Sequence, residues 1–358
     1  MTIDDFTIEI FTIVTRANMS KWKYLIAYAA PLSAILGLYL KGWWSPGAMY
    51  VGFLIIPLIE GLFYSEMGIK ISSEEKRSPI LFNLFLYLNI PLLYFILFYY
   101  FYTIQHHPGL SWAEHLALMV NVGLIIGTSG INVAHELGHR KERYHHWMSW
   151  ILLLPALYLH FFIEHNKGHH RNIATALDPA TARKGEPIYS FWLRSMRDSY
   201  VHAWKLEAER LRGMNRNPIS FNNLMLKFQV ATLGYLILIG ILFSFNIMIM
   251  AILIGLVGVL FLESVNYIEH YGLLRKINAD GTPGPIHEGL SWDADQPLGR
   301  IFLYELTRHA DHHTNATIPY QDLKPKIHSP KLAYGYPASI LLALVPAWWF
   351  CVMDKRLG

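Results

Sequence analysis

Long apolar runs alternate with polar segments along this chain. Six runs contain almost no charged residue, and they occupy residues 24–40, 48–63, 80–104, 116–134, 228–245 and 247–262. A helix that crosses a membrane needs about 20 apolar residues, within a range of about 17–25. Two of the runs are slightly short by this measure, but all six are acceptable as spans. The pattern therefore predicts an all-α protein, a bundle of six transmembrane helices.

The polar residues collect in two blocks, residues 135–227 and 263–336, and each block begins where a predicted span ends. A further apolar stretch, residues 147–163, is interrupted by Pro155 and His160. We interpret this stretch as a re-entrant or interfacial segment. The sequence contains no linker-like or low-complexity segment and no internal repeat, so residues 1–358 are expected to form a single membrane-embedded domain.

The composition fits a membrane protein, because 53% of the residues are hydrophobic and 16% are charged, against about 25% charged in soluble domains. Lys and Arg are concentrated in alternate connections between the spans, and residues 105–115 contain neither. By the positive-inside rule, both polar blocks and both termini then face the cytoplasm. This predicts an inner-membrane protein with a cytoplasmic helical cap. Topology explains the basic residues, so nucleic acid is not an expected partner.

Half of the 18 histidines fall into four short clusters, all on the predicted cytoplasmic side. The clusters are His135 and His139; His165, His169 and His170; His270; and His309, His312 and His313. Spacings of three and four residues place imidazoles on one face of a helix, which a shared metal ion requires. So many imidazoles at a membrane surface have no packing rationale, so metal binding is the favoured interpretation. The isolated histidines are interpreted as structural, and they are His106, His107, His160 and His202. The adjacent pair at 145–146 is set aside because the chain re-enters an apolar stretch there.

The segment HELGH, residues 135–139, also fits the H-E-x-x-H signature of zinc proteases. A catalytic zinc ion uses about three protein ligands, so nine imidazoles fit two metal ions better than one. The single cysteine, Cys351, excludes thiolate sites. Imidazole suits zinc, copper, iron and nickel alike. Because a site at a membrane implies an apolar substrate, redox chemistry with O2 is its natural use, and this favours iron.

The clusters occur in the order HELGHRKE, FFIEHNKGHHRNIATALDPATARKGEPIY, NYIEHYGLL and RHADHHTNAT. With these motifs the chain resembles the integral-membrane alkane 1-monooxygenases, relatives of the membrane fatty-acid desaturases and hydroxylases. The resemblance implies a histidine-bound pair of iron ions on the cytoplasmic side and conversion of n-alkanes from the lipid bilayer to 1-alkanols with O2. It also implies electrons from a separate rubredoxin, reduced by an NADH-dependent reductase. The implied metal ligands are His135, His139, His165, His169, His170, His270, His309, His312 and His313.

Several other residues are candidates for supporting roles. The carboxylates expected to support the ligands from outside are Glu60, Glu136, Glu164, Asp178, Glu269 and Asp311. Small residues in the spans could make room for a substrate tunnel or allow close helix contact, and these are Gly52, Gly123 and Gly127. Basic residues near the clusters could dock an acidic redox partner, although topology explains them equally well; they are Lys141, Arg143 and Arg183.

Two departures from the family pattern are visible. Residues 287–299 read HEGLSWDADQPLG where the family commonly has a His- and Asn-rich stretch, and the last cluster has Ala310 in place of Ser. The first departure puts a supporting role of this loop in doubt. Two alternatives stay open, namely a related hydroxylase or desaturase of fatty acyl, sterol or aryl-methyl substrates, and a membrane zinc protease. The NYIEHYG element argues against the first of these.

Overall fold

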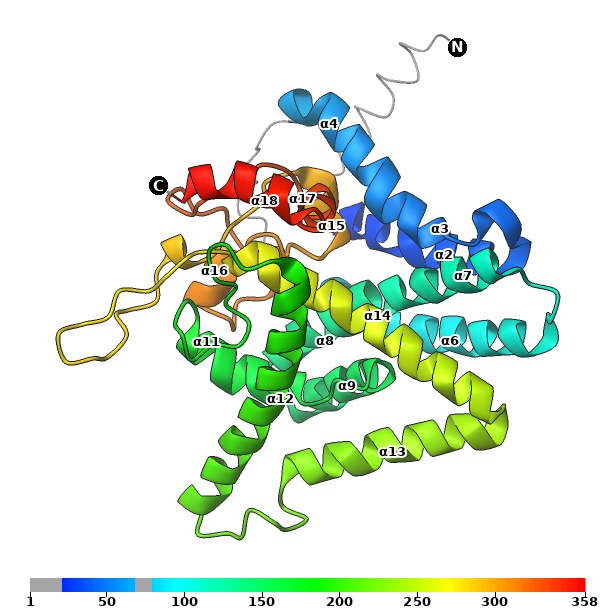
Figure 1. The fold of residues 1–358 in the computed structure, drawn as a ribbon, viewed down its shortest axis with the longest axis horizontal. Coiled ribbons are helices and arrows are strands. Elements are labelled where there is room, and N and C mark those ends of the chain that lie inside the picture. The colour runs from blue at the N-terminus through cyan, green and yellow to red at the C-terminus, as the bar shows by residue number, and fades with distance from the viewer. Residues whose placement is uncertain (1–20, 68–78, 358) are drawn as a thin grey trace.

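The computed structural model describes residues 21–67 and 79–357, and this part of the chain is helical with no β-strand (Figure 1). Two isolated β-bridges, Ile277–Pro283 and Asp293–Lys331, occur in its loops. The predicted cytoplasmic N-terminus lies outside the described residues. An all-α fold is therefore confirmed for the described ranges.

Five helices in these ranges are long and apolar enough to cross a membrane. They are Lys21–Leu40, formed by η1 (Lys21–Tyr28) and α2 (Ala29–Leu40); Pro79–His106, formed by α5 (Pro79–Tyr87) and α6 (Asn89–His106); Trp112–Gly138, formed by α7 (Trp112–Ile125), η4 (Ile126–Ile131) and α8 (Asn132–Gly138); α13 (Leu224–Leu242); and α14 (Phe245–His270). These helices match five of the six predicted spans.

The run predicted as a span at 48–63 forms a shorter apolar helix, Gly47–Phe63. It is built from α3 (Gly47–Met49), η3 (Tyr50–Ile55) and the first part of α4 (Ile56–Met67). This helix is too short to be counted with the five by length and composition, so a sixth span stays a prediction.

Close helix contacts form the centre of the bundle, where α14 packs along α7 and η4. A Cβ atom on Gly123 would collide with Val257, and one on Gly258 would meet Ile126 Cγ2 at 2.6 Å. Glycine is therefore required on both helices at this crossing. Of the two uses predicted for Gly123, close helix contact is the one observed. α13 packs mainly on α14, and Phe243 at its end contacts Phe98 and Phe101 of α6.

The first polar block contains several short helices followed by one long one: α9 (Arg143–Leu153), η5 (Leu154–Ala156), α10 (Phe161–Glu164), η6 (His165–His169), α11 (His170–Asn172) and α12 (Ile188–Gly213). The apolar stretch 147–163 is broken inside this series, because η5 contains Pro155 and Leu157 follows with a φ of 55°. The chain therefore does not continue as one helix through this stretch. An interfacial or re-entrant position for it stays a prediction.

The second polar block follows α14 and covers the same end of the bundle (Figure 1). Its helices are η7 (Glu288–Leu290), α15 (Pro297–Phe302), α16 (His309–Thr314) and η8 (Tyr320–Asp322), and the chain ends with α17 (Tyr336–Ala343), α18 (Pro346–Met353) and η9 (Asp354–Arg356). A buried ion pair joins this block to the first span, since Glu305 accepts from Lys23 at 2.8 Å. Glu305 also accepts from Arg300, in the same block, at 3.0 Å. Burial opposes the charge of Glu305, but these cations and Arg308 outweigh it and lower its pKa to about 2.

Candidate metal centre

The nine clustered histidines meet at the end of the apolar helices from which the two polar blocks emerge. α8 carries His135 and is followed directly by His139, and η6 with the start of α11 carries the second cluster. His270 is the last residue of α14, because this helix continues two turns beyond the predicted span. α16 carries the fourth cluster. The structure thus brings together every position that the sequence indicated.

The nine imidazoles form two groups, and in each group one ligand atom from every residue lies within 4.8 Å of the others. The first is His135, His139, His165, His170 and His312; the second is His169, His270, His309 and His313. We call these the five-histidine group and the four-histidine group. The sequence did not indicate how the nine residues divide, and this geometry divides them into two groups.

The spacing of the ring nitrogens is that of a ligand set. In the five-histidine group, Nε2–Nε2 distances are 3.0 Å for His135–His312, 3.1 Å for His139–His165, 3.0 Å for His165–His170 and 3.2 Å for His170–His312. In the four-histidine group they are 3.2 Å for His169–His313 and 2.9 Å for His309–His313. Two nitrogens that each lie about 2.1 Å from one ion, at a right angle, are about 3 Å apart. The residues therefore fit two metal ions.

A π-helical turn distributes the second cluster between the two groups. η6 is a π-helix, in which the backbone bonds join residues five apart. His165 and His170 consequently lie on the same side and enter the five-histidine group, whereas His169 enters the other. In a regular α-helix residues five apart would point in different directions. This local irregularity is what lets three nearly adjacent histidines serve two sites.

Burial keeps most of these imidazoles in the neutral form that binds metals. It lowers the pKa of each of six histidines outside the spanning helices well below the ordinary value, and neighbouring imidazoles add to the effect; the six are His139, His165, His170, His309, His312 and His313. His169 differs, because burial also opposes its charge but Asp178 raises its pKa above the ordinary value. The buried His270 Nε2 has no hydrogen-bond partner, which fits a nitrogen reserved for a ligand.

Two of the six predicted carboxylates touch the four-histidine group. Asp178 accepts a hydrogen bond at 3.0 Å from His169 Nδ1, and the Thr181 hydroxyl donates to the same oxygen at 2.6 Å. Glu269 has one oxygen 3.2 Å from His309 Nε2, and its other oxygen accepts from the Tyr336 hydroxyl at 2.8 Å. A carboxylate on the outer nitrogen of a ligand histidine fixes the ring and its tautomer. Asp178 has this geometry.

The other four carboxylates bond to other elements. Glu136 pairs with Arg140 at 2.5 Å and accepts from the Tyr320 backbone at 3.2 Å, which leaves it badly placed as the general base of a zinc protease. The remaining three hold the polar blocks in place: Glu164 bonds to His202 Nδ1 at 3.2 Å, Asp311 to the Lys324 backbone at 2.7 Å, and Glu60 to the Gly299 backbone at 2.7 Å.

The loop 287–299, whose role the sequence put in doubt, supports both groups. Asp293 accepts a hydrogen bond at 2.8 Å from the Ala310 backbone, in the first turn of α16. The Trp292 backbone donates to the carbonyl of Glu269 at 2.8 Å. These contacts hold α16 against the end of α14. Sequence reasoning missed Asp293 and Tyr336, because each meets its partner far away along the chain and neither lies in a motif.

The isolated histidines and the set-aside pair His145–His146 all lie outside the two groups. His145 is bonded to the Tyr87 hydroxyl at 2.6 Å and to Glu142 at 3.1 Å, and His146 to the Arg140 carbonyl at 2.7 Å. Their side chains join α9 to neighbouring segments. Setting this pair aside agrees with the geometry.

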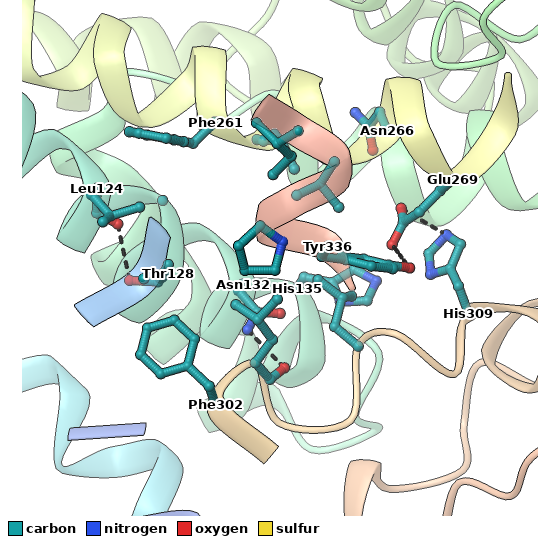
Figure 2. Close-up of a pocket in the computed structure, with 18 of the residues that line it drawn as sticks. Leu124, Thr128, Asn132, His135, Phe261, Asn266, Glu269, Phe302, His309 and Tyr336 are labelled. Atoms are coloured by element: carbon teal, nitrogen blue, oxygen red, sulfur yellow. Dashed lines mark hydrogen bonds and ion pairs between the residues drawn. The ribbon is translucent and has the colours of Figure 1, made fainter. Parts of the chain in front are cut away.

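An apolar pocket leads to both groups (Figure 2). Its wall includes His135 and His165 from one group and His309 from the other. Most of the remaining wall is apolar and comes from η3, α7, η4, α10, α14, α15 with the turns that follow it, and α17: Gly52, Phe53, Leu124, Gly127, Phe161, Phe261, Leu262, Val265, Phe302, Leu303, Leu306, Pro337 and Ile340. Figure 2 shows the polar side chains of Glu269 and Tyr336 beside His309, at one end of this space. The pocket therefore suits an apolar molecule with one end held at the histidines.

Comparison with known proteins agrees with this geometry. The family model described as fatty acid desaturase matches residues 110–342. An alkane 1-monooxygenase of Ectopseudomonas oleovorans is 34% identical over 350 residues, which is 95% of this chain and 86% of the relative. Alkane 1-monooxygenase 1 of Alcanivorax borkumensis is 34% identical over 93% of this chain and 84% of its own length. The hydroxylase component of xylene/toluene monooxygenase from Pseudomonas putida is 25% identical over 94% of this chain and 89% of its own length.

An all-helical membrane fold with clustered histidines at one end of the bundle defines the class, and the chain belongs to the fatty acid desaturase family. The matched region contains all four histidine clusters. Within that family the chain belongs to the alkane 1-monooxygenase branch, because the identity extends over nearly all of both sequences. The resemblance seen in the motifs is thus confirmed.

Proposed function

We propose that this protein is an alkane 1-monooxygenase, which hydroxylates the terminal methyl group of medium- and long-chain n-alkanes to 1-alkanols. The observation that carries the proposal is the apolar pocket whose wall includes histidines of both groups. The names of the relatives support the same reaction. In the balanced reaction, R–H, O2, two electrons and two protons give R–OH and water.

In this proposal the five-histidine group and the four-histidine group each hold one iron ion, and all nine residues are ligands. The donor set fits, since it consists of neutral imidazole nitrogens about 3 Å apart without thiolates. A bound pair of iron ions supplies the capacity to accept electrons and to activate O2 toward an unactivated C–H bond. Asp178 bonds to the outer nitrogen of His169, which fixes the orientation of this ligand ring.

The pocket would select the substrate by shape, because an alkane offers no hydrogen bonds. Each buried CH2 group contributes about 0.8 kcal/mol, so a long chain gains enough to leave the bilayer and enter. Phe53 and Phe261 lie 5.6 Å apart between ring centroids on the pocket wall and narrow it. A chain confined in this way presents only its end to the histidines. The terminal methyl group is therefore the one that reacts.

Glu269 and Tyr336 form the polar end of the pocket. Their 2.8 Å hydrogen bond keeps one Glu269 oxygen turned away while the other faces His309 at 3.2 Å. A water molecule or a product hydroxyl group could bond to this pair, whereas most of the rest of the wall is apolar. The pair would thus position a polar group at the reacting end of the pocket, while the apolar wall contacts the alkyl chain.

The proposal extends to the membrane and to the electron supply. The chain forms a single domain in the inner membrane with six spans, and the polar blocks and the metal centre form a cap on the cytoplasmic side. Lys and Arg in alternate connections support this orientation. The electrons come from a separate rubredoxin that an NADH-dependent reductase keeps reduced.

Turnover of defined substrates by the purified protein with rubredoxin, its reductase and NADH tests the proposal. Octane and hexadecane should give 1-alkanols, and the protein should contain two iron ions per chain. The relative of the xylene/toluene monooxygenase type makes aryl-methyl substrates the second candidate. Faster turnover of xylene than of any n-alkane would favour it, and one zinc ion per chain with no NADH consumption would contradict both.

A further inference from the structure

Two loops lie side by side over the four-histidine group. One is the loop between α11 and α12, and the other is the segment that follows α14. Backbone hydrogen bonds join them, from Gly272 to Ala182 at 2.9 Å and from Arg275 to Ala174 at 2.7 Å. The Arg275 guanidinium also donates to the Arg171 carbonyl at 3.0 Å. The two loops therefore present one continuous surface.

This surface is basic. Its exposed cationic side chains are Arg171, Arg183, Lys184 and Lys276. The acidic residues of the two loops are Asp178, which is 2% exposed, Glu186, which is partly buried and pairs with Arg194 at 2.7 Å, and the exposed Asp280. The four exposed cations therefore outnumber the one exposed carboxylate of the two loops.

Two large apolar side chains stand on the same surface. Leu177 is 70% exposed and Leu274 is 75% exposed, although both lie in loops outside the spanning helices. Basic residues around exposed apolar side chains are a common feature of surfaces that bind another protein. We call Arg171, Leu177, Arg183, Lys184, Leu274 and Lys276 the carrier surface.

The carrier surface is connected to the four-histidine group through one buried hydrogen bond. Leu177 is followed by Asp178, whose carboxylate bonds to His169 Nδ1 at 3.0 Å. His169 belongs to the four-histidine group. A single buried side chain therefore separates a protein docked at Leu177 from an imidazole of the centre.

We propose that a small acidic electron-carrier protein docks on the carrier surface and that its electrons enter at the four-histidine group through Asp178 and His169. This inference rests on the proposed function, since the reaction needs two electrons for each alkane and O2. A one-electron carrier is oxidised at each visit, so two reduced carriers dock in each turnover. The charge of the surface selects the acidic partner and accelerates its approach.

Titration of reduced rubredoxin against purified variants tests the docking surface. The variants are R183E/K184E and L177D, and the matched control is K205E/R212E, which reverses two exposed cations on α12. We expect the KM for rubredoxin to rise at least tenfold in both test variants, with kcat at saturating rubredoxin within twofold of the unaltered protein. The control should stay within twofold in both constants. Raising the ionic strength should weaken binding to the unaltered protein and change R183E/K184E much less.

A second pair, K141E/R143E, distinguishes this surface from the basic residues near the five-histidine group. An unchanged KM in R183E/K184E, or a larger rise in K141E/R143E, overturns the proposal. Iron content and thermal midpoint show whether each variant is folded. The dissociation constant of rubredoxin, measured directly without alkane, reports on docking even if no alkanol forms. Lack of alkanol from the unaltered protein would instead count against the proposed function.

Discussion

Gly52 offers a way to shorten the pocket without touching the metal centre. A Cβ atom at this position would meet only Leu124 Cδ2, at 3.6 Å, which is an ordinary contact. Leu124 precedes His135 by 11 residues on one helical run, so it lies about 16 Å from the histidines along the axis. A leucine in place of Gly52 would therefore fill the end of the pocket that is remote from the histidines.

The loss can be worked out per methylene group. If Gly52→Leu removes room for three CH2 groups, a long alkane loses about 2.4 kcal/mol of binding, or roughly a factor of 60 in kcat/KM. An alkane short enough to leave that end empty should lose little. The ratio of kcat/KM for hexadecane to that for octane should therefore fall by more than an order of magnitude.

The assay is alkanol formation from octane, dodecane and hexadecane, each at several concentrations, with iron content measured in parallel. Gly61→Leu is the matched control, because this glycine is on the same helical run and a Cβ there would meet nothing within 4 Å. A uniform loss for all three alkanes, or an unchanged hexadecane-to-octane ratio, would refute the assignment of this end of the pocket to the alkyl chain.

Three further predictions concern the metal centre and its supports. His270→Ala should lower iron from two ions per chain to one, whereas the exposed His107→Ala should leave it unchanged, as measured by elemental analysis. Asp293→Ala removes the acceptor for the backbone N–H of the first turn of α16. We expect the free energy of unfolding to fall by about 1–2 kcal/mol and the iron content to fall as well. Asp293→Asn should lower both less, because its amide oxygen still accepts the hydrogen bond. The pKa of Glu305 is lowered to about 2, mainly by Arg300 and its neighbours against the effect of burial, so the ion pairs contribute stability above pH 5 that is lost as the pH falls toward 2. The thermal midpoint should therefore drop on acidification, and Glu305→Gln should be less stable at pH 7 by about 3–5 kcal/mol with a weaker pH dependence; equal slopes for both proteins would contradict this account.

The spans were predictable where hydrophobicity alone decides the structure. The run at 116–134 and the helix Trp112–Gly138 agree because an apolar run has no other stable form in a membrane. The end of α14 was placed too early, since its last two turns contain Glu263 and Glu269, which look like the start of a polar loop. Burial of these two carboxylates against Tyr158 and Tyr336 allows the helix to continue.

The composition of the candidate site was more predictable than its geometry. Spacing indicated which histidines gather, because i,i+3 and i,i+4 pairs share a helix face. It did not indicate that His169 and His170 would separate, since this depends on the π-helical turn at η6. Nor could it reveal Asp293 or Tyr336, which bond to residues 17 and 67 positions away. Such partners are set by tertiary packing and leave no local signal in one sequence.

The same helices form the pocket wall and carry the histidines. α8 contributes Asn132 to the wall and His135 to both the wall and the five-histidine group, and α14 contributes Asn266 to the wall and His270 to the other group. Within each helix the two positions are one turn apart, so the backbone fixes the distance between the confined chain and the metal ligands. The proposed preference for a terminal methyl group therefore follows from rigid helix geometry, and it requires no segment that closes over the substrate.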